Sequence, residues 1–187
     1  MSIYLIRHGK TEANEKHLYC GSTDLPLSPL GAAELRPLPV DTENLTFITS
    51  GMRRTNQTLR ALFGDVPFRE EPLFREMDFG IFEMKSYLEL KDTPEYQLWL
   101  TGDNAANLPP RGESAVQMKT RVLEAFSQLQ GNVCIVTHGG VIAAIMEQLF
   151  PDENKNLYQW QPKNGCGYHI CGDRYWKIPL EDQHEKI

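Results

Sequence analysis

Two histidines in this sequence each follow a short apolar run and precede a glycine. The run Tyr4-Leu5-Ile6 stops at Arg7-His8-Gly9, and the run at 133–136 stops at Thr137-His138-Gly139-Gly140. An imidazole can act as a nucleophile or carry a proton near neutral pH, and adjacent glycines let backbone N–H groups approach an anion closely. Both segments are therefore candidates for chemistry on an anionic substrate.

Arginines accompany these histidines. Arg7 directly precedes His8, and Arg53 and Arg54 follow a third apolar run, at 46–49, that ends at Ser50. A guanidinium binds phosphate oxygens in pairs and stays charged at any relevant pH. From the residues alone, either arginine of the Arg53-Arg54 pair could instead be a solvated helix residue. Taken together, the groups favour a pocket for a phosphoryl group.

The elements that must position these side chains can be predicted from apolar spacing. Short apolar runs predict strands at 3–6, 46–50 and 133–136, and helical periodicity predicts helices at about 29–35, 53–63, 116–129 and 140–149. We expect a loop at 74–83, an irregular helical excursion at 85–110 and a hairpin at 169–178. Strands that alternate with helices predict an α/β fold, a three-layer α/β/α sandwich around a mostly parallel sheet.

That fold would bring the candidate residues together. Ligands of open α/β sheets bind beyond the carboxyl ends of the strands, where helix N-termini also point. The polar groups after three separate strands would then meet in one pocket. The chain of 187 residues fits one domain, 1–187, and the excursion at 85–110 is expected to cover the pocket and contribute to specificity.

Composition narrows the class of protein. A net charge of -6 argues against a general nucleic-acid binder, because binding to the phosphate backbone needs a basic surface. The sequence has no apolar run long enough to cross a bilayer, and its start has no basic-then-apolar signal segment. Four cysteines without a CxxC pair favour reduced thiols. We expect a soluble, cytoplasmic protein; nothing in the sequence indicates its oligomeric state.

A metal site is a second interpretation of the histidines. His8 and His138 could bind a metal ion together with Glu76, but two arginines beside these ligands would repel a cation. We therefore expect neither a metal nor another cofactor.

Six segments, in order, resemble the histidine phosphatase superfamily, whose founding members are the phosphoglycerate mutases. The matching segments are Arg7-His8-Gly9 with Thr11 and Asn14, the DLPLSPLG loop at 24–31, the TSGMRRTNQT segment at 49–58, the EMDFGIFE loop at 76–83, the PRGES turn at 110–114 and the VTHGG segment at 136–140. The resemblance implies a phosphoglycerate mutase-like fold and a metal-independent phosphomonoesterase that acts on a small phosphorylated metabolite.

The resemblance also implies catalytic roles. His8 would attack phosphorus to form a phosphohistidine, with the N–H of its other ring nitrogen held by a backbone carbonyl. Glu76 would protonate the leaving alkoxide and then take a proton from the hydrolytic water, which requires a raised pKa that partial burial beside Met77 and Phe79 could provide.

The remaining implied roles concern phosphate binding. The alignment selects Arg54, rather than Arg53, as the phosphate ligand. The implied ligand set is Arg7, Asn14, Arg54, His138 and the N–H of Gly139, with Arg7, Arg54 and His138 also stabilising the transition state.

The choice among family members depends on shorter cues. The chain is short, which favours a phosphatase over a mutase. Methionine at position 84, after Glu83, and the segment 160–167 resemble the α-ribazole phosphatase branch of cobalamin biosynthesis. A broad sugar-phosphate phosphatase, a fructose bisphosphatase-like enzyme and a phosphoglycerate mutase remain alternatives, as does a non-catalytic module that binds phosphorylated ligands. Within the excursion, Tyr96 and Trp99 could touch a substrate base, although core packing is favoured.

Lys10 departs from the family pattern, which usually has Glu or Gln at this position. It is either a tolerated change at the pocket rim or a source of positive potential that favours a dianionic phosphate.

Overall fold

The sheet at the centre of the molecule combines parallel and antiparallel strands. The computed structural model describes residues 1–38, 40 and 42–179. Within these residues the strand order is β3-β2-β4-β1-β5-β6. The bounds are β1 Ser2–Arg7, β2 Leu45–Thr49, β3 Phe68–Glu70, β4 Asn132–Thr137, β5 Gly167–Cys171 and β6 Arg174–Ile178. The first four strands of this order pair in parallel, and β5 runs antiparallel to both β1 and β6.

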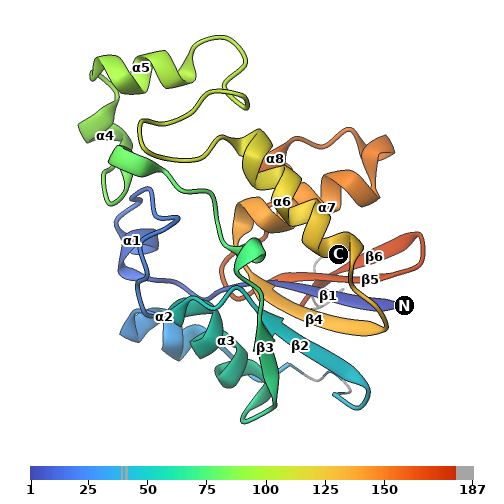
Figure 1. The fold of residues 1–187 in the computed structure, drawn as a ribbon. Helices are drawn as coiled ribbons and strands as arrows, with labels where there is room; N and C mark the ends of the chain where they lie inside the picture. The colour runs from blue at the N-terminus through green and yellow to red at the C-terminus, as the bar shows by residue number, and fades with distance from the viewer. Residues whose placement is uncertain (39, 41, 180–187) are drawn as a thin grey trace, which may run out of the picture.

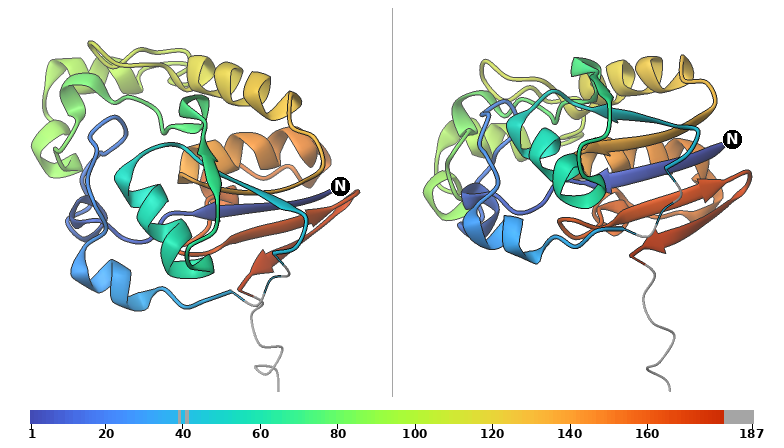
Figure 2. Two further views of the ribbon diagram at one scale, coloured as in Figure 1. Left: turned by 60° about the horizontal axis from the view of Figure 1, so that its bottom comes forward. Right: turned by 90° about the horizontal axis from the view of Figure 1, so that it is seen from below.

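Helices cover both faces of this sheet (Figures 1 and 2). Helices α2 (Pro29–Glu34) and α3 (Arg53–Phe63) lie on one side, and α6 (Ala115–Ser127) and α7 (Gly139–Leu149) on the other. Each side has its own hydrophobic cluster, the larger one between the sheet and α6 and α7. Because β4 is buried on both faces, its inner residues form a continuous apolar run rather than an alternating one. The three-layer α/β/α sandwich with a mostly parallel sheet is thus confirmed.

Local sequence signals account for most of the element boundaries. Ser28 caps α2 through a bond from the N–H of Gly31, and a proline occupies the first helical position. Helix α3 ends at Phe63, before Gly64, as predicted. The hairpin is also confirmed, although β5 begins two residues earlier than expected. No strand was predicted at β3, because this short edge strand is polar and has no apolar run.

Short helices also lay outside the sequence prediction. They are α1 (Glu12–Glu15), α8 (Leu157–Trp160) and the 3-10 turns η1 (Pro72–Phe74), η2 (Gly80–Phe82) and η3 (Pro151–Glu153). A single turn has too few residues to show helical periodicity. Within the described part of the chain, no helix has both the length and the apolar character that a bilayer crossing requires.

Residues 85–110, called the cap below, form a lobe beyond the sheet on the side to which β1 points (Figure 1). The cap contains α4 (Tyr87–Leu90) and α5 (Pro94–Leu100), in line with the predicted irregular helical excursion. Leu90 and Tyr96 of the cap form a small core with Phe82 of η2. Tyr96 is only 2% exposed, and its hydroxyl lies 2.6 Å from that of Tyr19. Tyr96 is therefore a packing residue, as favoured above, and Trp99 packs against the same cluster.

Candidate active site

His8 and His138 lie side by side at the ends of two adjacent strands. Strands β1 and β4 pair in parallel with Arg7 opposite Thr137, so the next residue of each strand enters the same space. The ring centroids are 5.2 Å apart at an interplanar angle of 63°. His8 is 6% exposed and His138 is fully buried. The structure therefore brings together the two imidazoles that the sequence separates by 130 positions.

The contacts of His8 leave its outer ring nitrogen free to react. Its Nδ1 lies 2.7 Å from the carbonyl oxygen of Gly9, which can only accept a hydrogen bond, so Nδ1 carries the proton and Nε2 holds the lone pair. Burial, followed by the charge of Arg54, holds the pKa of His8 well below its usual value. A neutral imidazole with a bare Nε2 is the form that a nucleophile needs, and the expected contact with a backbone carbonyl is confirmed.

His138 is held from the opposite side. Its Nε2 lies 2.8 Å from the hydroxyl oxygen of Ser50, which in turn lies 3.1 Å from the hydroxyl of Thr55. The other ring nitrogen, Nδ1, is buried without a hydrogen-bond partner among the described residues. Burial, then the charge of Arg54, lowers the pKa of His138 well below its usual value. The ring is thus fixed through one nitrogen while the other stays open.

Arg54 and Arg53 have different surroundings although they are neighbours in sequence. Arg54 is 1% exposed, and its guanidinium donates to the carbonyl oxygens of Gly21 (2.8 Å) and Thr23 (2.9 Å). Two of its five N–H bonds are used in this way, and its charge acts on both histidines. Arg53 is exposed, and its backbone N–H donates to Asp24. Arg54 is therefore the arginine that lies with the histidines.

Arg7 is the second arginine beside the histidines. Its Nη1 donates to the carbonyl oxygen of Pro162 at 2.9 Å, and its buried Nε has no partner among the described residues. Burial lowers the pKa of the Arg7 guanidinium, and the charge of Glu76 opposes this shift. A guanidinium fixed at one nitrogen still has N–H bonds for another acceptor.

Glu76 lies at the N-terminus of α7, next to the histidines. One carboxylate oxygen accepts from the N–H of Gly140 at 3.0 Å, and the other from the N–H of Met77 at 3.1 Å. A Cβ at position 140 would lie 2.5 Å from Glu76 Oε1, so glycine is needed for this close approach. The negative charge of Glu76 also acts on Arg7 and Arg54. The carboxylate therefore belongs to the same pocket.

The prediction that glycines would expose N–H groups to an anion is wrong at Gly9 and Gly140 and stays a prediction at Gly139. The N–H of Gly9 donates to Thr58 Oγ1 at 2.9 Å, and the N–H of Gly140 is used by Glu76. The N–H of Gly139 has no bond to any described residue. Gly9 instead packs closely against Leu35 and its neighbours, so its small size serves packing.

Asn14 presents its amide to the pocket side through the cap of α1. Its Oδ1 accepts from the N–H of Thr11 at 2.9 Å and from the Thr11 hydroxyl at 3.0 Å. Asn164 also approaches this oxygen, at 3.4 Å. Because the oxygen is occupied, the side-chain NH₂ remains as a donor.

Lys10 does not extend its charge freely into the pocket. Its ammonium lies 2.9 Å from the carboxylate of Glu34. Because both side chains are partly exposed, this ion pair is weak, and a contribution of Lys10 to the potential of the pocket stays a prediction.

A segment that sequence analysis did not assign to the site supports it from behind. The carbonyl of Cys166 accepts from the N–H of Arg7 at 2.9 Å, and the N–H of Gly165 approaches the carbonyl of Arg7 at 3.0 Å. The side chain of Asn164 donates to the carbonyl of His8 at 3.0 Å. These contacts hold the backbone of Arg7 and His8 at the end of β1, and the carbonyl of Pro162 holds the Arg7 side chain. Backbone partners of this kind leave no signal in residue type or spacing.

Glu83, the last residue of the EMDFGIFE loop, holds the neighbouring loop at 21–23. Its carboxylate accepts from the N–H groups of Gly21 (2.8 Å), Ser22 (3.0 Å) and Thr23 (3.2 Å), and from the Thr23 hydroxyl (2.6 Å). Gly21 and Thr23 also provide the two carbonyl oxygens that hold Arg54. Glu83 therefore orders the loop that orients the pocket's most buried cation.

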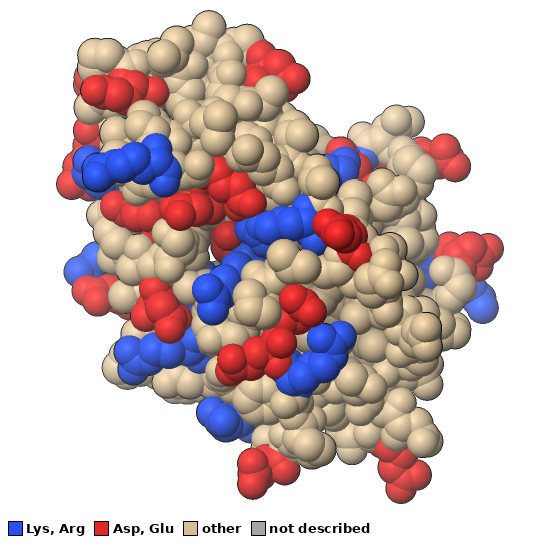
Figure 3. All heavy atoms as spheres, viewed as in Figure 1, with Lys and Arg blue, Asp and Glu red and all other residues tan. Residues whose placement is uncertain are grey.

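Charges of both signs meet around this site. On the face shown in Figure 3, basic and acidic side chains alternate along the line where the cap joins the rest of the molecule. An adjoining cavity of about 390 Å³ is lined by Glu76 together with Arg75, Asp78 and Arg111. Among residues 1–38, 40 and 42–179, no group of three or more His, Cys, Asp or Glu side chains could hold a metal ion.

Comparison with known proteins agrees with this geometry. The sequence profile of the histidine phosphatase superfamily (branch 1) matches residues 3–177. The adenosylcobalamin/alpha-ribazole phosphatase of Salmonella typhimurium is 32% identical over 179 residues, which cover 89% of this chain and 88% of that protein. The crystal structure of the alpha-ribazole phosphatase from Shigella flexneri matches with a TM-score of 0.77 and 28% identity, over 94% of this chain and 93% of that one.

A second kind of relative matches less of its own length. The human 6-phosphofructo-2-kinase/fructose-2,6-bisphosphatase 4 is 32% identical over 153 residues, which cover 78% of this chain but 32% of that protein. The chain is thus a phosphatase, a hydrolase of small phosphorylated metabolites, and it belongs to branch 1 of the histidine phosphatase superfamily.

Proposed function

We propose that this enzyme hydrolyses the phosphomonoester of α-ribazole 5'-phosphate through a phosphohistidine formed on His8. The observation that carries the proposed chemistry is the pocket in which a neutral His8, with Nε2 bare, lies against His138 and a buried Arg54. Similarity along nearly the whole length of α-ribazole phosphatases supports the substrate.

In the first step, His8 Nε2 attacks phosphorus and the bond from phosphorus to the ribose oxygen breaks. The leaving alkoxide takes a proton from the carboxylic acid of Glu76. Negative charge on the phosphoryl oxygens is stabilised by Arg7, Arg54 and His138, because fixed donors in a buried site stabilise developing charge without reorganising. Arg7 Nε and His138 Nδ1 are two of the four buried side-chain nitrogens that have no partner among the described residues.

In the second step, water attacks the phosphohistidine. Glu76, now a carboxylate, takes a proton from this water as the bond between His8 Nε2 and phosphorus breaks, and inorganic phosphate leaves. This step restores the proton that Glu76 gave up in the first step and leaves His8 neutral. Asn14 and the N–H of Gly139 act as neutral donors to the phosphoryl oxygens.

Two local features support the α-ribazole branch. Met84 has a φ of 60°, a left-handed conformation that favours glycine, the residue that most relatives have after the glutamate. The segment 160–167, whose sequence resembles this branch, contains Pro162, Gly165 and Cys166, which contact Arg7. We propose that residues 1–187 form one domain and that the cap is the part of it that faces the substrate. A cytoplasmic location also stays a prediction.

A screen of phosphate esters with a chelator present tests this proposal. The wild-type enzyme should show its highest kcat/KM with α-ribazole 5'-phosphate, compared with fructose 2,6-bisphosphate, ribose 5-phosphate and 3-phosphoglycerate. A preference for fructose 2,6-bisphosphate would favour the alternative bisphosphatase. Interconversion of phosphoglycerates, stimulated by bisphosphoglycerate, would favour a mutase. Binding of phosphate without turnover of any ester would favour a non-catalytic module.

A further inference from the structure

Arg121, on helix α6, uses all five of its guanidinium N–H bonds within the protein. Nε and Nη2 donate to the two carboxylate oxygens of Glu113, each at 2.7 Å. Nη1 donates to the carbonyl oxygens of Leu73 (2.7 Å) and Arg75 (2.8 Å), and Nη2 also donates to the carbonyl oxygen of Glu76 (3.1 Å). A guanidinium has only these five donors, so none remains for a ligand.

The carbonyls that Arg121 holds belong to the segment that carries Glu76. The carbonyl oxygen of Phe74, within the same segment, accepts from Thr137 Oγ1 at 2.7 Å. Four consecutive carbonyls, at 73–76, therefore accept hydrogen bonds from side chains, three of them from one guanidinium. Thr137 directly precedes His138, so the same segment is tied both to α6 and to the strand end that delivers the second histidine.

The pairing of Arg121 with Glu113 fixes the direction of the guanidinium. Both side chains are about one-fifth exposed, at 21% and 20%, and the two parallel bonds form a bidentate pair. Lysine has the same charge but is a point donor with three N–H bonds, and it cannot reproduce this planar arrangement. The geometry of the 73–76 segment thus depends on the planar shape of the Arg121 guanidinium and not only on its charge.

We propose that Arg121, oriented by Glu113, is a positioning residue that sets where the Glu76 carboxyl delivers its proton. This inference rests on the proposed role of Glu76 as the acid. The Glu76 backbone is held by Arg121 and its carboxylate by the N–H of Gly140, so the two ends of the residue have separate anchors. Loss of the first anchor should displace the carboxyl from the leaving oxygen without removing it from the pocket.

The leaving group of the substrate distinguishes this role from a merely structural one. An alkyl phosphate releases a strongly basic alkoxide and needs a proton from Glu76, whereas p-nitrophenyl phosphate releases a stable phenolate and does not. The quantity to measure is the ratio of kcat/KM for ribose 5-phosphate to kcat/KM for p-nitrophenyl phosphate. Because both values come from one preparation, the fraction of folded enzyme cancels in the ratio.

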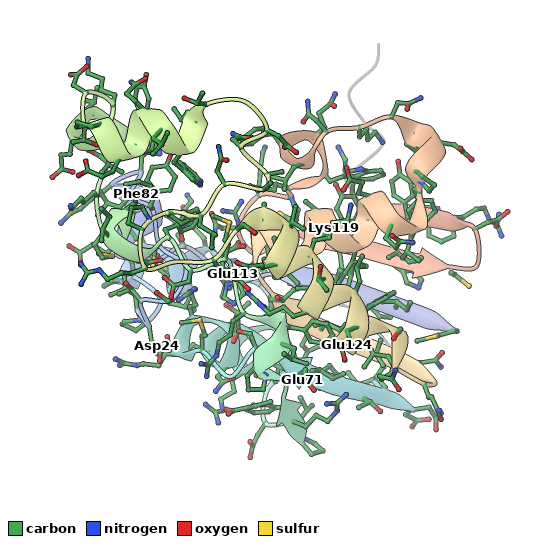
Figure 4. All side chains as sticks on the ribbon, turned by 45° about the horizontal axis from the view of Figure 1, so that its top comes forward. Asp24, Glu71, Phe82, Glu113, Lys119 and Glu124 are labelled. Carbon is green, nitrogen blue, oxygen red and sulfur yellow. The ribbon has the colours of Figure 1, made fainter. Side chains whose placement is uncertain are left out.

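Four variants complete the experiment. Glu76→Gln is the benchmark for loss of the acid, and Arg121→Lys and Glu113→Gln disrupt the positioning contacts. The matched control is Lys119→Arg, which also exchanges one cation on α6. Lys119 pairs with Glu147 at 2.5 Å and makes no hydrogen bond or ion pair with the 73–76 segment. Figure 4 shows Glu113 beside the start of α6 and Lys119 further along this helix.

The expected result has three parts. Glu76→Gln should lower the ratio by about 10²-fold or more, the usual contribution of general acid catalysis. Arg121→Lys and Glu113→Gln should each lower it by about tenfold or more, because a displacement of about 1 Å can be costly for proton delivery. Lys119→Arg should leave the ratio unchanged.

Two results would overturn the inference and are distinguishable. If Glu76→Gln lowers the ratio but both Arg121→Lys and Glu113→Gln leave it unchanged, Arg121 has only a structural role and the proposed function stands. If Glu76→Gln itself leaves the ratio unchanged, the proposed acid is wrong and the inference falls with it.

Discussion

The phosphate-binding floor and the cap are built in opposite ways. The floor, here His8, Arg54 and His138, is at most 6% exposed. The side chains of Arg54 and His138 are fixed by hydrogen bonds to other segments, and that of His8 by one to the carbonyl of the adjacent Gly9. In the cap, Leu88 and Leu98 are more than 70% exposed, and the packing depends on a small aromatic cluster. The difference suggests that the floor does the chemistry common to the family and that the cap can change with the substrate.

Burial in the floor has an energetic consequence. A polar group that is buried without a hydrogen-bond partner lowers the stability of the protein. Several nitrogens of the floor have no such partner in the described part of the chain until a substrate binds. In the cap only Leu90, Tyr96 and Pro109 are buried, so changes at its other side chains should cost less. Predictions that compare the two regions follow, from the largest expected effect to the smallest.

Replacement of the nucleophile should have the largest effect. His8→Ala should lower kcat/KM for every phosphate ester by about 10⁴-fold or more, because no other group of the floor can form the phosphoenzyme. Steady-state assays with p-nitrophenyl phosphate measure this loss. The control is His169→Ala, which removes a ring that stacks on Tyr4 and lies outside the site. Substantial residual turnover in His8→Ala would mean that the reaction does not take place at the floor.

The neighbouring arginines offer a matched pair. Arg54→Ala should lower kcat/KM by about 10²–10³-fold, the usual cost of removing one fixed donor to a charged transition state. Arg53→Ala, a change of the same size one residue away, should alter it by less than about twofold, because Arg53 is exposed. Equal losses in the two variants would contradict the assignment of Arg54 to the floor.

Acid should destabilise the floor. His8 and His138 have lowered pKa values in the folded protein, so below the unfolded value of about 6.5 the unfolded chain binds more protons. The contribution of the two histidines to the free energy of unfolding should therefore be complete above this pH, and the free energy of unfolding should fall as the pH drops below it. Urea unfolding at several pH values between 5 and 8 measures the slope.

The same slope can be assigned to one residue. His138→Gln should make the free energy of unfolding less dependent on pH between 5 and 6.5 than it is in the wild type. The cap has no histidine at 85–110, so Tyr96→Phe should leave the slope unchanged. If His138→Gln retains the full slope, His138 is not one of the groups that titrate.

The smallest effect is expected in the cap. Tyr96→Phe removes the hydroxyl that lies 2.6 Å from that of Tyr19 and should lower the free energy of unfolding by about 1 kcal/mol. The kcat/KM for p-nitrophenyl phosphate, a substrate too small to need the cap, should change by less than about twofold. A large loss of this activity would show that cap and floor are not independent.

Arg54 shows which part of the site could be predicted from the sequence. On α3 the buried positions include Arg54, Thr58 and Leu62, which repeat at four-residue spacing, while Arg53 and Gln57 are exposed. The helical phase of this segment therefore already separates the two arginines without reference to any family. The strand ends at His8 and His138 were predictable for a similar reason, since a buried apolar run stops at each.

Other parts of the site had no such signal. The bonds from Pro162 and Cys166 to Arg7 use backbone carbonyls, which every residue has. The donation of the Gly9 N–H to Thr58 likewise depends on how two distant segments pack, and it made the glycine prediction wrong at that position. Tertiary hydrogen bonds to the backbone follow from the fold, so residue type and spacing cannot reveal them.

The most direct test of the account is to trap the phosphoenzyme. Enzyme in excess is mixed with ³²P-labelled substrate, quenched in denaturant and digested. The account predicts a transient label on the peptide that contains His8, stable to base and labile to acid as a phosphoramidate is, and absent in His8→Ala. Phosphate release with no labelled protein in a single turnover, or label on a residue other than His8, would contradict it.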